Sequence, residues 1–469
     1  MENEVYAVWG GPIVVIGFGS IAQGLLPLLS RHISFSDNQL YFIEPKEKRL
    51  LQIGRPDAHL INVALTRGNY KTTLDAIIKA TGQQSLIINV SVDVSSVDII
   101  KYAQHTNSLY IDTVIEPWAN HYTNFSLPTV ERTNYHLREE LLQLRKSLPK
   151  GPTAVSCCGA NPGMVSWLVK EALMNLANDL EKKVREPETQ AGWAELMQEL
   201  GVQGIHIAEK DSQTSITKKS ASEFINTWSV EGMIAESIQP AELGWGTHEE
   251  QLPKNAHTHV GGSKCAIYLD TPGGQTKLRS WVPSGPQEAY LITHNEAISI
   301  SEYFTVRDSE GSVVYRPTCN YAYHPTADTI QSLAEMFDKP TAHIEHTILA
   351  AENIATGSDE LGVLLYGHKK NAYWYGSKLT IEETRKLAPH QNATGLQVTS
   401  AVLSGIVWMI TYPTKGIVEV EEIDYKMCLN LQRKYLGSVS GVYTDWYPNN
   451  TMKESLPEEK RWQFSNIKM

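Results

Sequence analysis

The chain has 469 residues, 42% of them apolar and 20% charged, a globular composition long enough for about two or three domains. Lysine and arginine number 41 against 52 aspartates and glutamates, a formal net charge of −11. An acidic chain without a basic block is not expected to bind nucleic acid or an anionic membrane surface. We expect no disulfide scaffold, because the chain has only five cysteines, and no signal peptide, because it begins Met-Glu-Asn-Glu. We expect no membrane anchor either, because the apolar run at 401–412 is too short to span a bilayer. These features predict a cytoplasmic protein.

Short apolar strands alternate with amphipathic helices over the first third of the chain. The expected strands are residues 12–17, 40–44, 86–90, 109–112 and 154–158. The expected helices are residues 20–29, 72–80, 97–104, 135–148 and 164–177. Continuous apolar strands joined by helices are typical of a parallel sheet that helices cover on both faces. The pattern predicts an α/β, Rossmann-type domain over residues 1–160.

The pattern then changes to alternating strands with fewer helices. The expected strands are residues 205–208, 265–269, 290–300 and 312–315. They predict a second domain of mixed α+β architecture over residues 161–390. A helix at 396–410 is apolar almost all round, so we expect residues 390–430 to pack back onto the first domain and 431–469 to form a C-terminal extension.

A glycine-rich turn follows the first expected strand and opens the first expected helix. Gly17, Gly19 and Ala22, with Ser20 and Ile21 between them, match the pattern G-x-G-x-x-A. Gly17 permits a tight turn, Gly19 lets a pyrophosphate approach the backbone, and the small Ala22 lets helix and strand pack closely. The N–H groups at the helix N-terminus favour that anion. The turn therefore predicts a dinucleotide site.

An acidic residue ends the second expected strand. Glu44 lies 22 residues after Ala22, where a carboxylate can accept hydrogen bonds from the adenosine ribose hydroxyls. The same carboxylate would repel a 2′-phosphate, so NAD is favoured over NADP. Lys46, Lys48 and Arg49 follow closely and keep NADP open.

Polar side chains stand where the later strands of the first domain end. The carboxyl ends of parallel strands meet at one edge of the sheet, where ligands bind. Ser91 and Thr113 are expected to hydrogen-bond the nicotinamide ribose, and Asn161 to orient the carboxamide or a substrate nitrogen. Polar residues at such positions are equally expected if their side chains only stabilise turns. The other candidates at this edge are Asn89, Asp93, Asp112, Glu116 and Cys157.

Acidic and aromatic residues, rather than arginines, mark the expected second domain. Arg279 is the only arginine between residues 201 and 300, whereas dehydrogenases of amino acids usually clamp each substrate carboxylate with arginine. Glu209 is expected at the end of a strand, on its apolar face. Trp228 lies before a predicted helix that carries Glu236. A lone tryptophan is more often a core residue, and a helical glutamate more often faces solvent.

A histidine and a carboxylate lie two residues apart in the expected strand 290–300. His294 and Glu296 would then face the same way, which suits an imidazole oriented by a carboxylate. His294 is as typical of a structural histidine as of a catalytic one. Asp359 follows a Gly-Ser turn. We predict no metal site, because His257 and His259 have a ligand-like spacing but no visible third ligand.

Six segments spread over nearly the whole chain form a specific combination. They read VVIGFGSIAQG (14–24), IDTVIEPW (111–118), CCGANPGMV (157–165), NTWSVEGMIAES (226–237), THNEAISI (293–300) and GSDELGVLL (357–365). Through them the chain resembles the bacterial homospermidine synthase family, a relative of the saccharopine and carboxynorspermidine dehydrogenases. GANPGM, NTWSVEG and THNEAIS carry most of the specificity, because the glycine motif is shared with many proteins.

The resemblance implies a transferase and its partners. The family makes homospermidine from two putrescines, or from putrescine and another polyamine such as spermidine, with NAD as a recycled cofactor. It also implies a homodimer, with the second domain used for substrate binding and dimerisation. Trp228 would offer a cation–π face, with Asp93 and Asp359 as supporting acids. The residues implied to hold the polyamine nitrogens are Glu116, Asn161, Glu209, Glu236, His294 and Glu296.

The chemistry of putrescine agrees with acidic side chains. Its amines have pKa values near that of lysine, about 10, so it is a dication at neutral pH. One amine must lose a proton before the adjacent carbon can give up a hydride, and a carboxylate or His294 is expected to accept that proton. Two alternatives stay open: an imine-reducing NAD(P)-dependent oxidoreductase, which would need arginines in its pocket, and a non-catalytic NAD-binding sensor.

Overall fold

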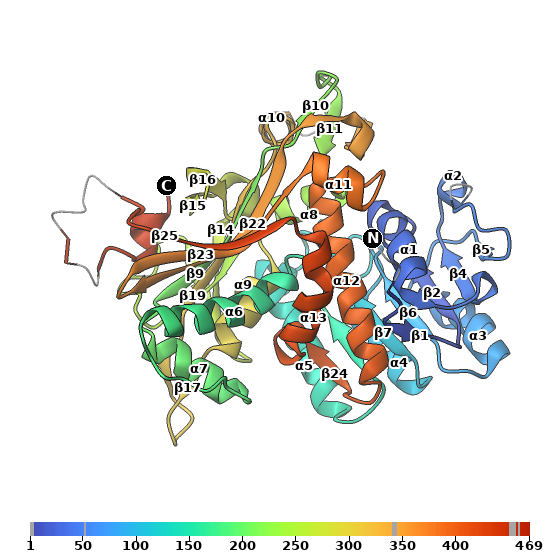
Figure 1. The fold of residues 1–469 in the computed structure, drawn as a ribbon, viewed down its shortest axis with the longest axis horizontal. Helices are drawn as coiled ribbons and strands as arrows, with labels where there is room; N and C mark the ends of the chain where they lie inside the picture. The colour runs from blue at the N-terminus through green and yellow to red at the C-terminus, as the bar shows by residue number, and fades with distance from the viewer. Residues whose placement is uncertain (1–3, 51–52, 340–344, 450–455, 458–459) are drawn as a thin grey trace.

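The computed structural model describes residues 4–50, 53–339, 345–449, 456–457 and 460–469. Two large β-sheets lie side by side, each covered by helices (Figure 1), and the described residues also form four two-stranded sheets. The helices α12 (Ala393–Thr411) and α13 (Tyr425–Gln432) lie between the two sheets (Figure 1). The cavity described below opens where the two layered units meet.

The first sheet has seven strands, all parallel. In spatial order they are β24 (Ile417–Glu419), β8 (Ala154–Ser156), β7 (Leu109–Asp112), β6 (Leu86–Asn89), β2 (Ile13–Ile16), β4 (Leu40–Ile43) and β5 (His59–Ile61). The chain runs from β2 outward to β5 and then returns to β6 on the other side of β2. This reversal opens a crevice beyond the carboxyl ends of β2 and β6. The predicted Rossmann-type fold is confirmed.

Helices cover both faces of the first sheet. On one face, α1 (Ser20–His32) packs beside α12. The helices of the other face are α3 (Tyr70–Thr81), α4 (Ser96–His105) and α5 (Asn134–Ser147). The strands are apolar runs because both of their faces are buried, as in Ile13–Ile16, where every residue is buried.

The segment 390–430 supplies α12 and β24 to this first unit. Ile417 of β24 pairs with Ala154 of β8. Among the described residues α12 is the one helix long and apolar enough to cross a membrane, and 83% of its most apolar window is buried inside the protein. The apolar run expected at 401–412 is therefore part of a longer helix of 19 residues, which serves as a core element.

The second sheet has ten strands and is mixed. The path of eight strands is β13 (Ala256–Thr258), β14 (Ala266–Pro272), β12 (Pro240–Gly244), β19 (Thr318–His324), β9 (Gly204–Asp211), β22 (Ser358–His368), β23 (Asn371–Thr380) and β25 (Ser438–Thr444). The hairpin of β15 (Lys277–Val282) and β16 (Gly285–Tyr290) joins it at β19. Among the described strands of this sheet, only β19 and β9 pair in parallel. The predicted mixed α+β second domain is confirmed.

Helices and a C-terminal segment cover the two faces of the second sheet. The helices α6 (Met164–Asp179) and α9 (Asn295–Tyr303) pack on one face. Residues 431–469, expected as an extension, contribute β25 as an edge strand, and Trp462 and Phe464 are buried in the core under the opposite face.

One predicted strand is wrong. The expected strand 290–300 ends at Tyr290, and α9 begins at Asn295 with His294 as its extended N-cap residue. Over residues 297–300 the small residues Ala297 and Ser299 alternate with isoleucines, and this period of two residues resembles that of a strand. Nearly every residue of the first two turns of α9 is buried, so the apolar face that marks a helix in sequence is missing. Tertiary packing decided this element.

Candidate active site

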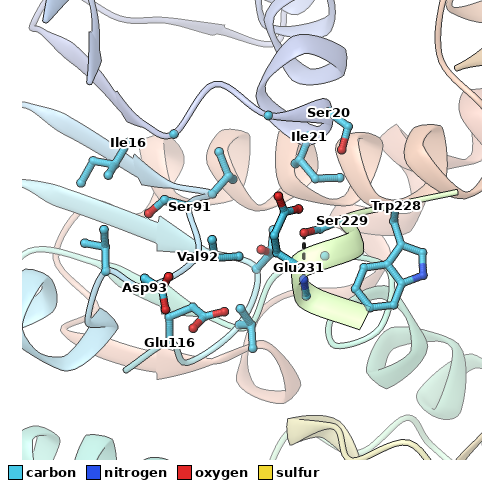
Figure 2. A pocket seen from close by; sticks show the side chains of 18 of the residues that line it. Ile16, Ser20, Ile21, Ser91, Val92, Asp93, Glu116, Trp228, Ser229 and Glu231 are labelled. Atoms are coloured by element: carbon cyan, nitrogen blue, oxygen red, sulfur yellow. Dashed lines mark hydrogen bonds between the residues drawn. The ribbon is translucent and has the colours of Figure 1, made fainter. Parts of the chain in front are cut away.

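A cavity of about 480 Å³ lies between the carboxyl ends of the first sheet and the second domain. Its walls come from both units, from α8 (Val230–Ile238) and from the start of α12. Figure 2 shows the carboxylates of Asp93 and Glu116 on one side of the pocket and the indole of Trp228 on another. The predicted site residues that line this cavity are Gly17, Gly19, Ser20, Ile21, Glu44, Ser91, Asp93, Thr113, Glu116, Asn161, Glu209, Trp228, Glu236 and His294.

The glycine-rich turn fits a pyrophosphate. Gly17 has a φ of +86°, and a Cβ there would lie 2.9 Å from the Cα of Ser91. A Cβ on Gly19 would meet nothing closer than 3.9 Å, so the backbone faces open space that a bound group can occupy. No side chain caps α1 at Gly19, which leaves the N-terminal N–H groups of the helix directed at that space.

Glu44 is held in the wall by backbone groups. Its two oxygens accept hydrogen bonds from the N–H of Phe18 at 2.7 Å and of Lys46 at 2.9 Å, and the side chain is 2% exposed. Each oxygen keeps a second lone pair for a ribose hydroxyl. Arg49 lies 3.7 Å from the carboxylate, and Lys46 lies 3.8 Å from Glu231 across the cavity. The side chain of Lys48 is outside the described part of the chain.

Three predicted cofactor residues lie behind the wall rather than in it. The amide oxygen of Asn89 accepts a hydrogen bond from the Ser91 hydroxyl at 2.7 Å. Asp112 accepts one from the backbone N–H of Cys157 at 2.7 Å, and burial raises the pKa of Asp112 to about 6. Asn89, Asp112 and Cys157 are all buried, and they support the loops that carry Ser91 and Asn161.

Glu116 belongs to a group of acids on the first-domain side of the cavity. Burial raises its pKa to about 8, and the negative charges of Asp93 and Glu236 add to the shift. Asp93 has a φ of +64°, a conformation that turns its side chain toward Glu116 (Figure 2). Glu116 therefore holds a proton at neutral pH until a cation approaches.

His294 lies between two carboxylates. Its Nε2 is 3.0 Å from Glu236, and its Nδ1 is 3.1 Å from Glu296. Burial alone would lower the pKa of His294, but Glu296 and Glu236 outweigh it and raise that pKa well above the ordinary value. The imidazole is therefore protonated and donates to both. Glu296, in the first turn of α9, is fully buried behind His294 and does not line the cavity.

Glu209 is a second titratable centre. Its Oε2 accepts hydrogen bonds from Asn161 Nδ2 at 2.8 Å and from the Tyr321 hydroxyl at 2.5 Å. Burial raises the pKa of Glu209 to about 7, although these two donors act in the opposite direction. Glu209 was expected at the end of its strand, but β9 continues to Asp211, so the carboxylate lies within the sheet.

Trp228 is held at the N-terminus of α8. The hydroxyl of Ser229 caps the helix by accepting a hydrogen bond from the N–H of Gly232 at 3.0 Å. Trp228 Nε1 donates to the Tyr323 hydroxyl at 3.3 Å, and a Cβ on Gly232 would lie 3.0 Å from the indole. The half-buried ring is thus fixed at its Nε1 edge, and it lines one side of the cavity (Figure 2).

Asp359 lies deeper in the protein than the residues of the cavity wall. It is fully buried, and its strand β22 places it opposite Asp211 of β9. Burial and the charges of Glu209 and Asp211 raise its pKa well above the ordinary value. Asp359 is not part of the cavity wall, so any effect on a ligand must pass through its neighbours.

Tyrosines and residues of α12 were missed in the sequence. Tyr321 and Tyr323 lie two apart on β19, with ring centroids 5.3 Å apart, and that spacing beside an acidic strand could have identified them. Thr394 and Val398 also line the cavity. Nothing in their local sequence marks them, because they reach the site only through the packing of α12 against α1.

The side of the cavity away from Glu44 is acidic. Among the described lining residues, lysine and arginine occur only as Lys46 and Arg49, both on the Glu44 side. No group of three or more histidine, cysteine, aspartate or glutamate residues in the described parts of the chain could hold a metal ion. The arrangement can hold cationic nitrogen against carboxylates and an indole, and can accept a proton near neutral pH.

Two family models match the chain. The saccharopine dehydrogenase NADP binding domain matches residues 13–155, and the saccharopine dehydrogenase C-terminal domain matches residues 159–441. Their junction falls just after β8, at the loop that carries Asn161.

Proteins named homospermidine synthase are similar over the full length. Those from Mesorhizobium japonicum and Blastochloris viridis are each 51% identical, covering 100% and 99% of this chain and 99% and 98% of their own. A crystal structure of homospermidine synthase from Legionella pneumophila in complex with NAD is 38% identical, with a TM-score of 0.89, covering 100% of this chain and 99% of that one.

Proposed function

The chain belongs to the homospermidine synthase family, and from that premise we propose how its cavity makes homospermidine from putrescine. The protein is an NAD-dependent aminoalkyl transferase. Bound NAD takes a hydride from the carbon next to a putrescine nitrogen and returns it to the imine formed after amine exchange. The open backbone at Gly19, the uncapped N-terminus of α1 and Glu44 are the groups that would hold the dinucleotide.

The observation that carries the proposal is the acidic, arginine-poor wall opposite the cofactor side. Glu116, Glu236 and the His294–Glu296 pair form one group, and Glu209 with Asn161 forms another. A diamine presents one positive charge to each group. The substrates are therefore polyamines, putrescine first and spermidine as a second candidate.

Glu209 is the proposed proton acceptor. Its pKa of about 7 lies near neutral pH, and its Oε1 is not used by Asn161 or Tyr321. His294 already carries its proton, and Glu116 holds one at neutral pH, so neither is poised to accept another. Glu209 would take a proton from the ammonium group whose adjacent carbon then loses hydride.

Trp228 is the proposed stabiliser of the resulting cation. Loss of hydride leaves a positively charged iminium, which the face of an indole attracts through its quadrupole. A second putrescine attacks the iminium carbon as a neutral amine, and ammonia leaves with the proton of the attacking nitrogen. Atoms and charge balance in this exchange, and no net oxidation occurs.

The two alternatives predict different cavities. An imine-reducing oxidoreductase acting on amino acids needs cationic side chains for substrate carboxylates, whereas the substrate wall is acidic. A sensor without catalysis needs no proton acceptor in the cavity. The transferase accounts both for the acidic wall and for a carboxylate that titrates near neutral pH.

The proposed reaction is tested by incubating the purified protein with putrescine and NAD and identifying the amines by mass spectrometry. We expect homospermidine and ammonia without build-up of reduced nicotinamide. Deuterium on the carbon next to the putrescine nitrogen should reappear in the product, because the same hydride is returned. Steady reduction of NAD without a coupled amine product would contradict the proposal.

We also propose that the enzyme works as a homodimer in the cytoplasm. All five cysteines are buried and unpaired, which is in keeping with a reducing compartment. Sedimentation equilibrium of the purified protein tests the assembly, and a mass of one chain at assay concentration would contradict it.

A further inference from the structure

A buried carboxylate outside the cavity anchors the turn that carries Trp228. Asp211 is 1% exposed, and its Oδ2 accepts a hydrogen bond from the Thr227 hydroxyl at 2.6 Å. The same oxygen accepts one from Thr394 at 3.2 Å, and Oδ1 accepts two from the backbone and side chain of Gln213, both at 3.0 Å. Four donors therefore converge on one carboxylate beside the residue that precedes Trp228.

The backbone of the same turn is bound to the start of α12. Asn392, the N-cap residue of that helix, donates from Nδ2 to the carbonyl of Thr227 at 2.6 Å. Gln213, which donates to Asp211, accepts a hydrogen bond from the N–H of Ala393 at 3.0 Å. The side chain of Thr227 is thus held by Asp211, and its carbonyl is held by Asn392 at the start of α12.

The start of α12 is in turn tied to the cofactor helix. Gln391 Nε2 donates to the carbonyl of Gly24 in α1 at 2.9 Å, and the two helices pack along their length. A continuous set of contacts therefore runs from α1 through Gln391 and Asn392 to Thr227. The turn that carries Trp228 and the proposed cofactor helix α1 are thus joined through the start of α12.

We propose that Asp211 is a positioning residue for the reaction, which sets the orientation of Trp228 relative to the bound cofactor through Thr227 and the N-terminus of α12. The proposal rests on the role of Trp228 given above. Asp211 touches neither substrate nor cofactor, because it does not line the cavity. Its effect on Trp228 passes through the turn at Thr227, so these two residues should act as one unit on the indole. Asp211 also reaches the cavity through Thr394 and through its charge on Glu209, and the change Thr227→Val leaves both of these routes in place.

Thr227→Val tests this connection because it removes one hydroxyl and keeps the shape of the side chain. We expect kcat to fall about tenfold, as for a lost hydrogen bond to a charged group, with an unchanged Kd for NAD. Thr227→Ser keeps the hydroxyl and should restore kcat. Thr384→Val is the matched control, since that buried hydroxyl donates to the carbonyl of Thr380, away from the cavity wall and from the turn that carries Trp228.

A double-mutant cycle separates positioning from general destabilisation. In a Trp228→Ala background the further change Thr227→Val should alter kcat less than about twofold, because there is no indole left to orient. The same loss in both backgrounds would overturn the inference and leave the role of Trp228 intact. A fully active Trp228→Ala enzyme would overturn the proposed role of Trp228, and the positioning role with it.

Discussion

The two sides of the cavity hold charge in opposite ways. The cofactor side uses backbone: an uncapped helix N-terminus, an open glycine at Gly19 and a carboxylate fixed by two N–H groups. The substrate side uses side chains: Glu116, Glu209 and the group around His294, drawn from four separate segments. Backbone N–H groups are available at any helix start, whereas carboxylates must be brought together and removed from water.

This difference has an electrostatic consequence. Gathering acids in a partly buried wall raises their pKa values, as in Glu116 and Glu209, because burial and mutual repulsion disfavour the charged form. The ionised form of these acids is therefore disfavoured when the cavity is empty and becomes favoured when a dication binds. The cofactor side relies on backbone N–H groups, which do not titrate, so pH should act on the two ligands differently.

The largest expected effect comes from the proposed proton acceptor. Glu209→Gln keeps the hydrogen-bond geometry but removes the base, so kcat should fall about 10² to 10⁴-fold, the usual range for a lost general base. Steady-state kinetics with putrescine check this. Tyr321→Phe is the companion variant: it keeps the base but removes a donor to the carboxylate, so the pKa in the kcat profile should rise. An active Glu209→Gln enzyme would assign the base elsewhere.

The next effect sharpens the role of the indole. Trp228→Ala should lower turnover about 30-fold, as expected for the loss of a desolvated cation–π contact, while Trp228→Phe should keep much of the activity because a ring face remains. Turnover of both variants at saturating NAD is the measurement. If the two variants are equally active, Trp228 does not stabilise the cation.

The pH dependence of putrescine binding probes the acidic wall. A dication favours the ionised carboxylates, so its Kd should fall by about tenfold per pH unit for each proton released, and level off above the pKa of Glu116, about 8. Isothermal titration calorimetry in buffers of different ionisation enthalpy counts the released protons. The Kd for NAD, measured in parallel, should hardly change, and an equal pH dependence of both would contradict the comparison.

The same shifts predict a stability trend without substrate. Carboxyls whose pKa is raised in the folded protein stabilise it below the ordinary value of 4.5, and this contribution is lost as pH rises through about 7 for Glu209 and about 8 for Glu116. The melting temperature should therefore fall over this window, and saturating putrescine should remove most of the decrease.

The smallest expected effects distinguish two glycines on the cofactor side. Gly17→Ala places a Cβ against Ser91 at a positive φ, so it should lower the melting temperature and weaken NAD binding roughly tenfold. Gly19→Ala meets nothing in the free protein, so it should weaken NAD binding without changing the melting temperature. A thermal scan with and without NAD compares them, and equal melting temperatures in the free proteins would contradict the proposed geometry.

Local sequence patterns predicted the strand, turn and helix of the cofactor side because these parts are contiguous. The strand β2, the turn at Gly17 and α1 follow one another within a single βα unit. The residues of the substrate side were predicted mainly through a family resemblance. The prediction that His294 and Glu296 are neighbours in a strand was wrong. The two residues do meet, but across the N-terminus of a helix, which a period of two residues cannot reveal.

Sequence alone determined which chemical groups this protein brings to its site: the glycine turn, the acids, the indole and the scarcity of arginine. The tertiary structure decided which of them face the cavity, since Asn89, Asp112, Cys157, Glu296 and Asp359 lie behind its wall. It also decided the protonation of the acids and of His294, because a pKa depends on burial and on neighbours that lie far apart along the chain.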